Sequence, residues 1–294
     1  MFKNMNILIA GGDARYLPVM EQLAESGASV YIAGYDHIKI DQDRIIQTNI
    51  ENMNFKQCDA ILLPVSGTDS AGHVTAMYSD SQVVLSQASF NQTPEHCIIY
   101  TGISGNYLEE AAKKANRKIV RLFERNDVAI FNSVPTAEGA LKIAIEETNH
   151  TIHGSNVMVL GFGRVGSTVS RTFHAMGAHV TVACRRSASF ARIHEMSMEP
   201  IYMNNVDDVI GTQHIVINTI PHPVLDETTL AKVNRSALLI DLASKPGGIN
   251  FKAAEDLGIK AIHALGIPGK TAPLTAGKII AQVMIELLQQ QNKS

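Results

Sequence analysis

The chain has 294 residues, a length typical of two domains, and its 45% apolar and 18% charged residues describe a folded globular protein rather than a disordered one. A net charge of −3 and only 5% aromatic residues disfavour a nucleic-acid-binding protein, which needs a concentrated positive field and stacking side chains. No apolar run reaches the roughly 18 residues that span a bilayer, no signal-peptide pattern is present, and three scattered cysteines indicate a reducing cytoplasm and no zinc site. We therefore expect a cytoplasmic protein that holds no metal and binds neither nucleic acid nor a membrane.

The first half begins with the pattern of a strand, a glycine turn, a helix and a second strand. The corresponding segments are the apolar run 6–10, then Gly11 and Gly12, the helical stretch 16–25 and the apolar run 29–33. Further along the half, the sequence predicts strands at 60–64, 83–85 and 97–100 and a helix at 107–115.

The second half repeats this pattern at an offset of 150 residues, so that Gly161 corresponds to Gly11. The segments are an apolar run at 156–160, the turn Gly161-Phe-Gly163-Arg-Val-Gly166, a helix to Met176 and a strand at 179–183, followed by strands at 215–218, 237–241 and 260–263 and a helix at 251–257. The apolar runs are continuous rather than alternating, which indicates strands buried on both faces of parallel sheets. The sequence therefore predicts an α/β protein with two doubly wound Rossmann-like domains.

The joint between the halves carries helix signals. Ser133 and an early proline, Pro135, precede a run of good helix formers. We expect a first, substrate-binding and catalytic domain at 1–133, a long connecting helix at 134–149 and a coenzyme-binding domain at 150–272. By analogy with two-domain dehydrogenases, the last helix, 278–291, is expected to pack back onto the first domain.

The glycine turn of the second half predicts a dinucleotide site. Gly161 permits a tight turn, Gly163 lets a pyrophosphate approach the backbone, and Gly166 lets helix and strand touch. The helix that follows offers free N–H groups and a partial positive charge to the phosphates. Within the turn, Phe162, Arg164 and Val165 complete the predicted coenzyme-binding segment.

The end of the second strand in that half indicates which coenzyme binds. A carboxylate there would accept hydrogen bonds from the adenosine ribose, but the sequence has Arg185, Arg186 and Ser187 instead. Guanidinium groups bind phosphates through paired donors, so NADP is favoured, with NAD possible. The alternative is that the two arginines form only a solvated rim.

The corresponding turn of the first half departs from the fingerprint. Asp13 would repel a pyrophosphate, and Tyr16 stands where the third glycine should be. We therefore expect that the first half does not bind a dinucleotide and is free to hold the substrate.

Several longer motifs resemble the family of dipicolinate synthase A subunits of spore-forming bacilli. They include residues 11–15 (GGDAR), 63–66 (LPVS), 122–125 (LFER), 132–139 (NSVPTAEG), 218–221 (NTIP), 241–248 (DLASKPGG), 266–269 (GIPG) and 272–277 (APLTAG). The resemblance implies an NAD(P)-dependent dehydrogenase that makes dipicolinic acid, from a dihydrodipicolinate-type precursor of the lysine pathway, in the mother cell of a sporulating bacterium. It also implies a partner, the flavoprotein-like B subunit of dipicolinate synthase.

Ligands of open α/β sheets bind beyond the carboxyl ends of the strands, so polar residues there are the candidate site. For the dicarboxylate substrate, the first domain offers Asp13, Arg15, Ser66, Gly67, Ser86, Ser89, Thr101 and Ser104. Around the nicotinamide, the second domain offers Thr219, Ile220, Pro221, Ala243, Ser244, Gly266, Ile267 and Pro268. As catalytic candidates we name Lys245, His222 and Lys270, which could pair with a carboxylate or accept a proton. For any single serine, ordinary turn chemistry is the more favoured explanation.

Two other functions remain open. One is a reductase like the D-2-hydroxyacid dehydrogenases, although Lys245 replaces their arginine and His263 is predicted inside a strand. The other is a non-catalytic subunit that senses a nucleotide and supports its partner. We also expect a homo-oligomer.

Overall fold

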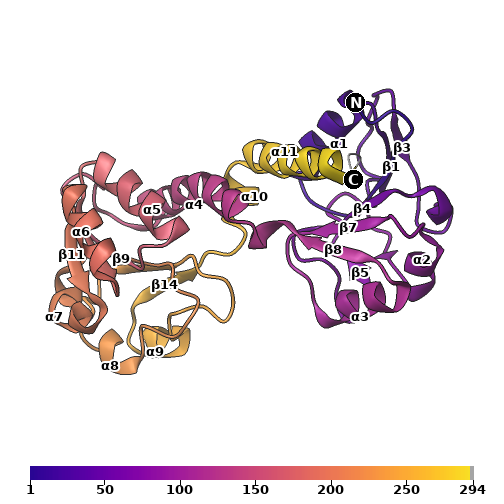
Figure 1. The fold of residues 1–294 in the computed structure, drawn as a ribbon. Coiled ribbons are helices and arrows are strands. Elements are labelled where there is room, and N and C mark those ends of the chain that lie inside the picture. The colour runs from indigo at the N-terminus through magenta and orange to yellow at the C-terminus, as the bar shows by residue number, and fades with distance from the viewer. Residues whose placement is uncertain (292–294) are drawn as a thin grey trace. The chain divides into compact units, whose positions relative to one another are not determined.

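The computed structural model describes residues 1–291 and divides into two compact units. The first unit contains Met1–Ala129 together with residues 272–291, and the second contains Ile130–Thr271. Each unit has one six-stranded parallel sheet between two layers of helices (Figure 1). None of the helices in residues 1–291 is both long and apolar enough to cross a membrane.

The sheet of the first unit has its first strand in the interior. In spatial order its strands are β3 (Ile45–Gln47), β2 (Ser29–Ala33), β1 (Asn6–Ala10), β4 (Ala60–Leu62), β7 (Ile98–Thr101) and β8 (Lys118–Arg121). The helices are α1 (Tyr16–Glu25), α2 (Gln87–Gln92), α3 (Asn106–Ala115) and α11 (Pro273–Gln291). Successive residues of β1 belong to opposite cores, with Ile7 and Ile9 on the α1 and α11 side and Leu8 on the α2 and α3 side. Burial on both faces explains why the strand is continuously apolar.

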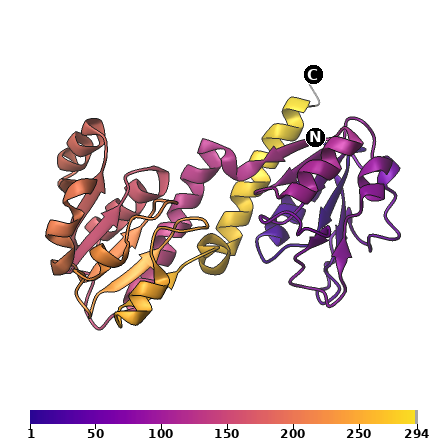
Figure 2. The same ribbon diagram turned by 90° about the horizontal axis from the view of Figure 1, so that it is seen from below.

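The last helix completes the first unit. The helix α11 lies along α1, and Ile280, Met284 and Leu288 belong to the same core as Leu23 (Figures 1 and 2). The two helices can approach closely because Gly277 has no side chain. A Cβ atom at this position would lie 2.1 Å from the carbonyl oxygen of Arg15.

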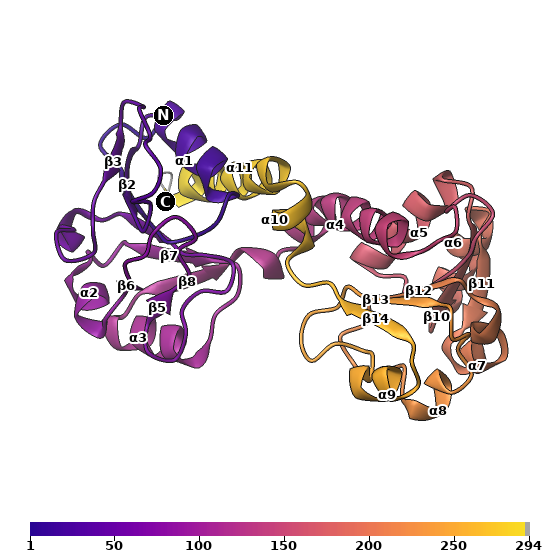
Figure 3. The same ribbon diagram turned by 180° about the vertical axis from the view of Figure 1, so that it is seen from behind.

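The second unit has the same strand order. Its strands are β11 (Glu199–Tyr202), β10 (His179–Cys184), β9 (Asn156–Leu160), β12 (Ile215–Asn218), β13 (Leu238–Asp241) and β14 (Lys260–His263) (Figure 3). Its helices are α5 (Arg164–Ala175), α6 (Ser187–Glu195), α7 (Val206–Val209), α8 (Glu227–Leu230), α9 (Phe251–Asp256) and α10 (Ile267–Thr271), and α4 (Asn126–Glu147) belongs to it from Ile130 onward. In both sheets the strand order reverses next to the first strand, between β1 and β4 and between β9 and β12, and ligands of such folds bind at this switch point. The predicted fold class of two doubly wound Rossmann-like domains is confirmed.

The predicted strand at 83–85 is not part of a parallel sheet. Residues Val83–Val84 form β6, which pairs antiparallel with β5 (His73–Val74) in a separate two-stranded ribbon. Besides β5, the strands β3, β8 and β11 were not predicted from the sequence, and these three are edge strands of the parallel sheets. An edge strand has one unpaired side, which weakens its apolar pattern, although the edge strand β14 was predicted.

The joint differs from the prediction in where its helix begins. The helix α4 starts at Asn126 rather than at residue 134, so Pro135 lies inside it rather than in its first turn. Proline has no N–H group, so this position donates no hydrogen bond within the helix. Similarly, α11 starts at Pro273 rather than at residue 278.

Candidate functional site

The glycine turn of the second unit is open on one side. Gly161, at φ +96°, leads out of β9, and a Cβ atom at Gly166 would lie 2.1 Å from its carbonyl oxygen. A Cβ atom at Gly163 would meet no atom within 4 Å. Gly163 also precedes α5, whose N-terminus has no side-chain cap. The backbone at Gly163 therefore faces open space, as close approach by a phosphate requires.

A cavity of about 210 Å³ adjoins this turn. Its lining residues are Gly161, Phe162, Gly163, Ala183, Cys184, Arg185, Arg186, Ser189, Met203 and Ile220. Four of them were not predicted from the sequence: Ala183, Cys184, Ser189 and Met203. Ala183 and Cys184 end β10, which was the available signal for them, whereas Met203 follows the unpredicted strand β11. Ser187 begins α6 and does not line the cavity; Ser189 does.

The charge at the cavity is positive. Arg185 and Arg186 are exposed, and neither forms an ion pair with any residue in the described part of the chain. Burial raises the pKa of the Cys184 thiol, so the cavity gains no thiolate at neutral pH. The open turn, the uncapped start of α5 and the two guanidinium groups fit a dinucleotide.

Two residues predicted to contact the coenzyme do not line the cavity, and their side chains contact other parts of the protein. The Thr219 hydroxyl donates to the carbonyl oxygen of Leu160 at 2.8 Å, so it supports the glycine turn from behind. Ile267 is buried in the core, where a Cβ atom at Gly139 of α4 would lie 2.1 Å from its Cγ2 atom. Its side chain packs against α4, and its contact with the coenzyme stays a prediction.

A buried carboxylate stands at the end of β13. Asp241 is fully buried, and its Oδ1 atom accepts hydrogen bonds from the Asn218 Nδ2 atom at 2.8 Å and the Ala243 backbone N–H at 3.0 Å. Its Oδ2 atom accepts from the backbone N–H groups of Gly248 at 2.7 Å and Ile249 at 3.2 Å. Sequence reasoning missed this role of Asp241 and Asn218, although a polar residue that ends an apolar strand was an available signal.

The three catalytic candidates stand on different elements. Lys245 is exposed in the loop after β13, His222 is exposed in the loop after β12, and Lys270 is exposed near the end of α10. His263 is the last residue of β14, within the strand as predicted, and its Nε2 atom is 3.4 Å from the carbonyl oxygen of Ala243. Of the other predicted residues in these loops, Pro221, Ser244 and Gly266 are exposed, Pro268 is half-buried and Ala243 is buried.

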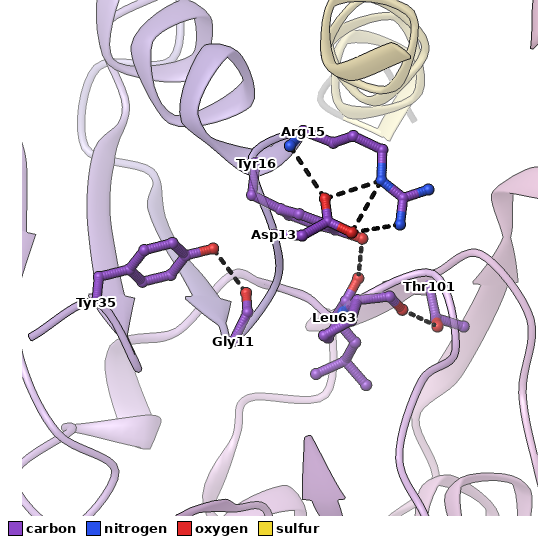
Figure 4. Close-up of polar contacts among 8 residues, drawn as sticks. Gly11, Asp13, Arg15, Tyr16, Tyr35, Leu63 and Thr101 are labelled. Atoms are coloured by element: carbon purple, nitrogen blue, oxygen red, sulfur yellow. Dashed lines mark hydrogen bonds and ion pairs between the residues drawn. The ribbon is translucent and has the colours of Figure 1, made fainter. Parts of the chain in front are cut away.

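The glycine turn of the first unit is filled by its own chain. A Cβ atom at Gly12 would lie 2.5 Å from the Tyr16 ring and 2.8 Å from the Tyr35 hydroxyl. The Tyr16 hydroxyl donates to the carbonyl oxygen of Leu63 at 2.9 Å, and that of Tyr35 donates to Gly11 at 2.7 Å (Figure 4). The backbone of Thr75 accepts a hydrogen bond from the N–H of Gly12 at 2.7 Å. Two aromatic rings and the segment after β5 thus occupy the space above this turn.

Asp13 and Arg15 pair with each other beside that turn. The Arg15 Nε atom donates to Asp13 Oδ1 at 2.9 Å, and its second terminal nitrogen donates to Oδ2 at 2.6 Å (Figure 4). Burial raises the pKa of Asp13, but the hydrogen bonds and charge of Arg15 outweigh it and hold the pKa below its ordinary value. A substrate carboxylate at Arg15 would therefore compete with Asp13.

Several of the other residues predicted to bind the substrate form hydrogen bonds within the protein. Thr101 is fully buried and donates to the backbone, so it holds a loop rather than facing a ligand. Ser89 sits in α2, with its backbone N–H bonded to Ser86; both follow the antiparallel ribbon, so their predicted place at the edge of the parallel sheet is wrong. Ser104 bonds to Glu109, and together with Arg121 it lowers the pKa of that carboxyl. Ser66 is exposed, and Gly67 is buried at φ +68°.

Comparison with known proteins places the chain in a family. Residues 6–123 match the family model described as the N-terminal domain of the dipicolinate synthase A subunit. The dipicolinate synthase A subunit of Bacillus subtilis (strain 168) is 46% identical over 288 residues, which cover 98% of this chain and 97% of that protein. The chain belongs to the family of dipicolinate synthase A subunits. Residues 134–246 match the NAD-binding domain of the D-isomer specific 2-hydroxyacid dehydrogenases.

Two crystal structures of dipicolinate synthase A subunits share the whole fold. The protein from Bacillus halodurans is 44% identical, with a TM-score of 0.95, and the match covers 98% of this chain and 99% of that one. The protein from Bacillus subtilis is 45% identical, with a TM-score of 0.94, and the match covers 100% and 98%. The resemblance drawn from the sequence motifs is therefore confirmed, and the dehydrogenase-type domain supports a nicotinamide coenzyme.

Proposed function

We propose that this member of the dipicolinate synthase family is an NADP-dependent oxidoreductase. It oxidises a dihydrodipicolinate-type precursor from the lysine pathway to dipicolinic acid during sporulation. The observation that carries the proposal is the open glycine turn beside a cavity edged by Arg185 and Arg186, in a chain whose relative is named for this synthase. Its partner is the flavoprotein-like B subunit, and it acts as a homo-oligomer in the mother-cell cytoplasm.

The second unit holds the coenzyme through backbone and guanidinium groups. The N–H groups at the start of α5 donate to the pyrophosphate, and Gly163 leaves room for it. Arg185 and Arg186 bind the 2′-phosphate, since no carboxylate at the end of β10 is available to the ribose. When bound, NADP⁺ supplies the acceptor for a hydride.

The reaction removes one hydride and one proton from the dihydropyridine ring, which becomes aromatic. Catalysis is therefore mainly a matter of holding the substrate beside the acceptor. Lys245, in the loop after β13, is the first candidate to pair with a substrate carboxylate or receive the proton, and His222 and Lys270 are the others. In the first unit, Ser66 and Ser104 stay predicted substrate-binding residues.

Coenzyme choice is tested by fluorescence titration. NADPH should bind more tightly than NADH, and Arg185→Ala should weaken NADPH binding by about tenfold or more while leaving NADH binding nearly unchanged. Arg192→Ala is the matched control, because Arg192 lies on α6 but is paired with Glu195. Equal affinity of the wild-type protein for NADH and NADPH would refute the assignment of the 2′-phosphate site.

The reaction itself is tested by reconstitution. Purified protein, its B-subunit partner, NADP⁺ and freshly made precursor should give rising ultraviolet absorbance from the pyridine ring, and Lys245→Ala should lower the rate strongly. A protein that only senses the nucleotide would instead tolerate this substitution. Full turnover by the variant would therefore remove Lys245 as the catalytic candidate.

A further inference from the structure

The ends of β12 and β13 carry a buried polar network that the proposed reaction does not use. Asn218 and Asp241 stand opposite each other in the register of the two strands, and both are fully buried. Removing a carboxylate from water is costly unless it is fully hydrogen-bonded. Asp241 meets that condition with four hydrogen bonds, of which three come from the backbone of its own loop.

The network fixes both ends of the loop that carries Lys245. Asp241 binds the N–H of Ala243 at the beginning of the loop and those of Gly248 and Ile249 at its end. Between these anchors, Lys245 and Pro246 are exposed. The loop closes tightly on the carboxylate, since a Cβ atom at Gly247 would lie 2.7 Å from its Oδ2 atom.

Asn218 links this loop to its neighbour. Its Nδ2 atom donates to Asp241 and also to the carbonyl oxygen of Ile220 at 3.0 Å, and its Oδ1 atom accepts from the Ile220 N–H at 3.0 Å. A Cβ atom at Gly248 would lie 2.3 Å from Asn218 Nδ2, so the two loops touch through this side chain. Ile220 lines the coenzyme cavity.

We propose that Asp241 is a positioning residue that presents Lys245 at the carboxyl edge of the sheet. Its two oxygens hold the loop 243–249 in one conformation, and Asn218 ties that conformation to the loop beside the coenzyme cavity. This role rests on the proposed function of Lys245. It differs from a purely stabilising role, because a more mobile loop should lower the turnover rate without weakening the binding of the coenzyme.

Asp241→Asn, which keeps the shape of the side chain but has only one acceptor oxygen, tests this role. Amide hydrogen exchange at Gly248 and Ile249 should become at least about tenfold faster, with the central strands β9 and β12 unchanged. In the reconstituted reaction, kcat should fall about tenfold or more, while KM for NADP⁺ stays within about twofold. Asp226→Asn is the control, because Asp226 also accepts a backbone N–H, at the start of α8, and should change neither readout.

A double variant separates the inference from the proposed function. Asp241→Asn combined with Lys245→Ala should be no slower than Lys245→Ala alone, because the two residues act in one unit. Additive losses, or wild-type exchange at Gly248 and Ile249 in Asp241→Asn, would overturn the positioning role while leaving Lys245 as a candidate. Full turnover by Lys245→Ala would instead overturn the proposed function of Lys245, and the positioning role with it. If Asp241→Asn does not fold, the double variant Asn218→Asp, Asp241→Asn takes its place in each of these measurements. This double variant keeps a hydrogen bond between residues 218 and 241.

Discussion

The two sheets of this chain share one strand order, yet the space above their first glycine turns is used in opposite ways. At Gly163 the backbone faces open space beside a positively charged cavity. At Gly12 the corresponding space holds the rings of Tyr16 and Tyr35 and the backbone of Thr75. A shared topology therefore provides a place for a ligand, and a few side chains decide whether that place is occupied by a ligand or by the protein.

The largest effect is expected when a methyl group is placed at the open turn. Gly163→Ala should weaken NADPH binding about 100-fold, because the new Cβ atom points to where the pyrophosphate approaches the backbone. The free energy of unfolding should change by less than about 1 kcal/mol, since no protein atom lies within 4 Å of that Cβ atom. Titration and urea unfolding measure the two quantities. Retained affinity would show that the coenzyme does not lie against this turn.

The same substitution at the filled turn should have the reverse outcome. Gly12→Ala should lower the free energy of unfolding by about 2 kcal/mol, because φ is +131° and the Cβ atom would collide with Tyr16. Coenzyme affinity should remain that of the wild type. A variant of normal stability would mean that Tyr16 does not fill the turn in solution.

A smaller effect is expected from removing one hydroxyl above the filled turn. Tyr16→Phe should cost about 1 kcal/mol in urea unfolding, because the buried carbonyl oxygen of Leu63 loses its hydrogen bond from Tyr16. Tyr31→Phe, at a half-buried position of β2, is the control and should change stability by less than about 0.5 kcal/mol. Equal losses in the two variants would contradict a specific role for the Tyr16 hydroxyl.

The smallest effect concerns the ion pair beside the filled turn. The folded-state pKa of Asp13 lies below its ordinary value of 3.8, so ionised Asp13 stabilises the fold above that value and loses the contribution as the pH falls. The stability difference between wild type and Asp13→Asn should be under about 1 kcal/mol near neutrality and should vanish between about pH 5 and pH 2. Unfolding curves at several pH values measure it. A difference that grows toward acid pH would contradict the pairing with Arg15.

The sequence was sufficient to predict the central strands and the open turn, because both depend on local rules. A strand buried on both faces must be continuously apolar, and close backbone approach requires glycine. The edge strands β3, β8 and β11 were not predicted, whereas the edge strand β14 was, so an unpaired side weakens the apolar pattern without always removing it. The filled turn was recognised only through Tyr16, since Tyr35 and Thr75 reach it by tertiary folding. The same holds for Asp241, whose partners are brought to it by the folding of a loop.

The packing of α11 against α1 also bears on how the molecule is made. The second unit is one uninterrupted stretch of chain, whereas the core of the first unit needs Ile280, Met284 and Leu288 from the far end. During synthesis from the N-terminus, the coenzyme-binding unit can fold on the ribosome. The amino-terminal sheet has to wait, with part of its apolar face uncovered, until translation delivers the final helix.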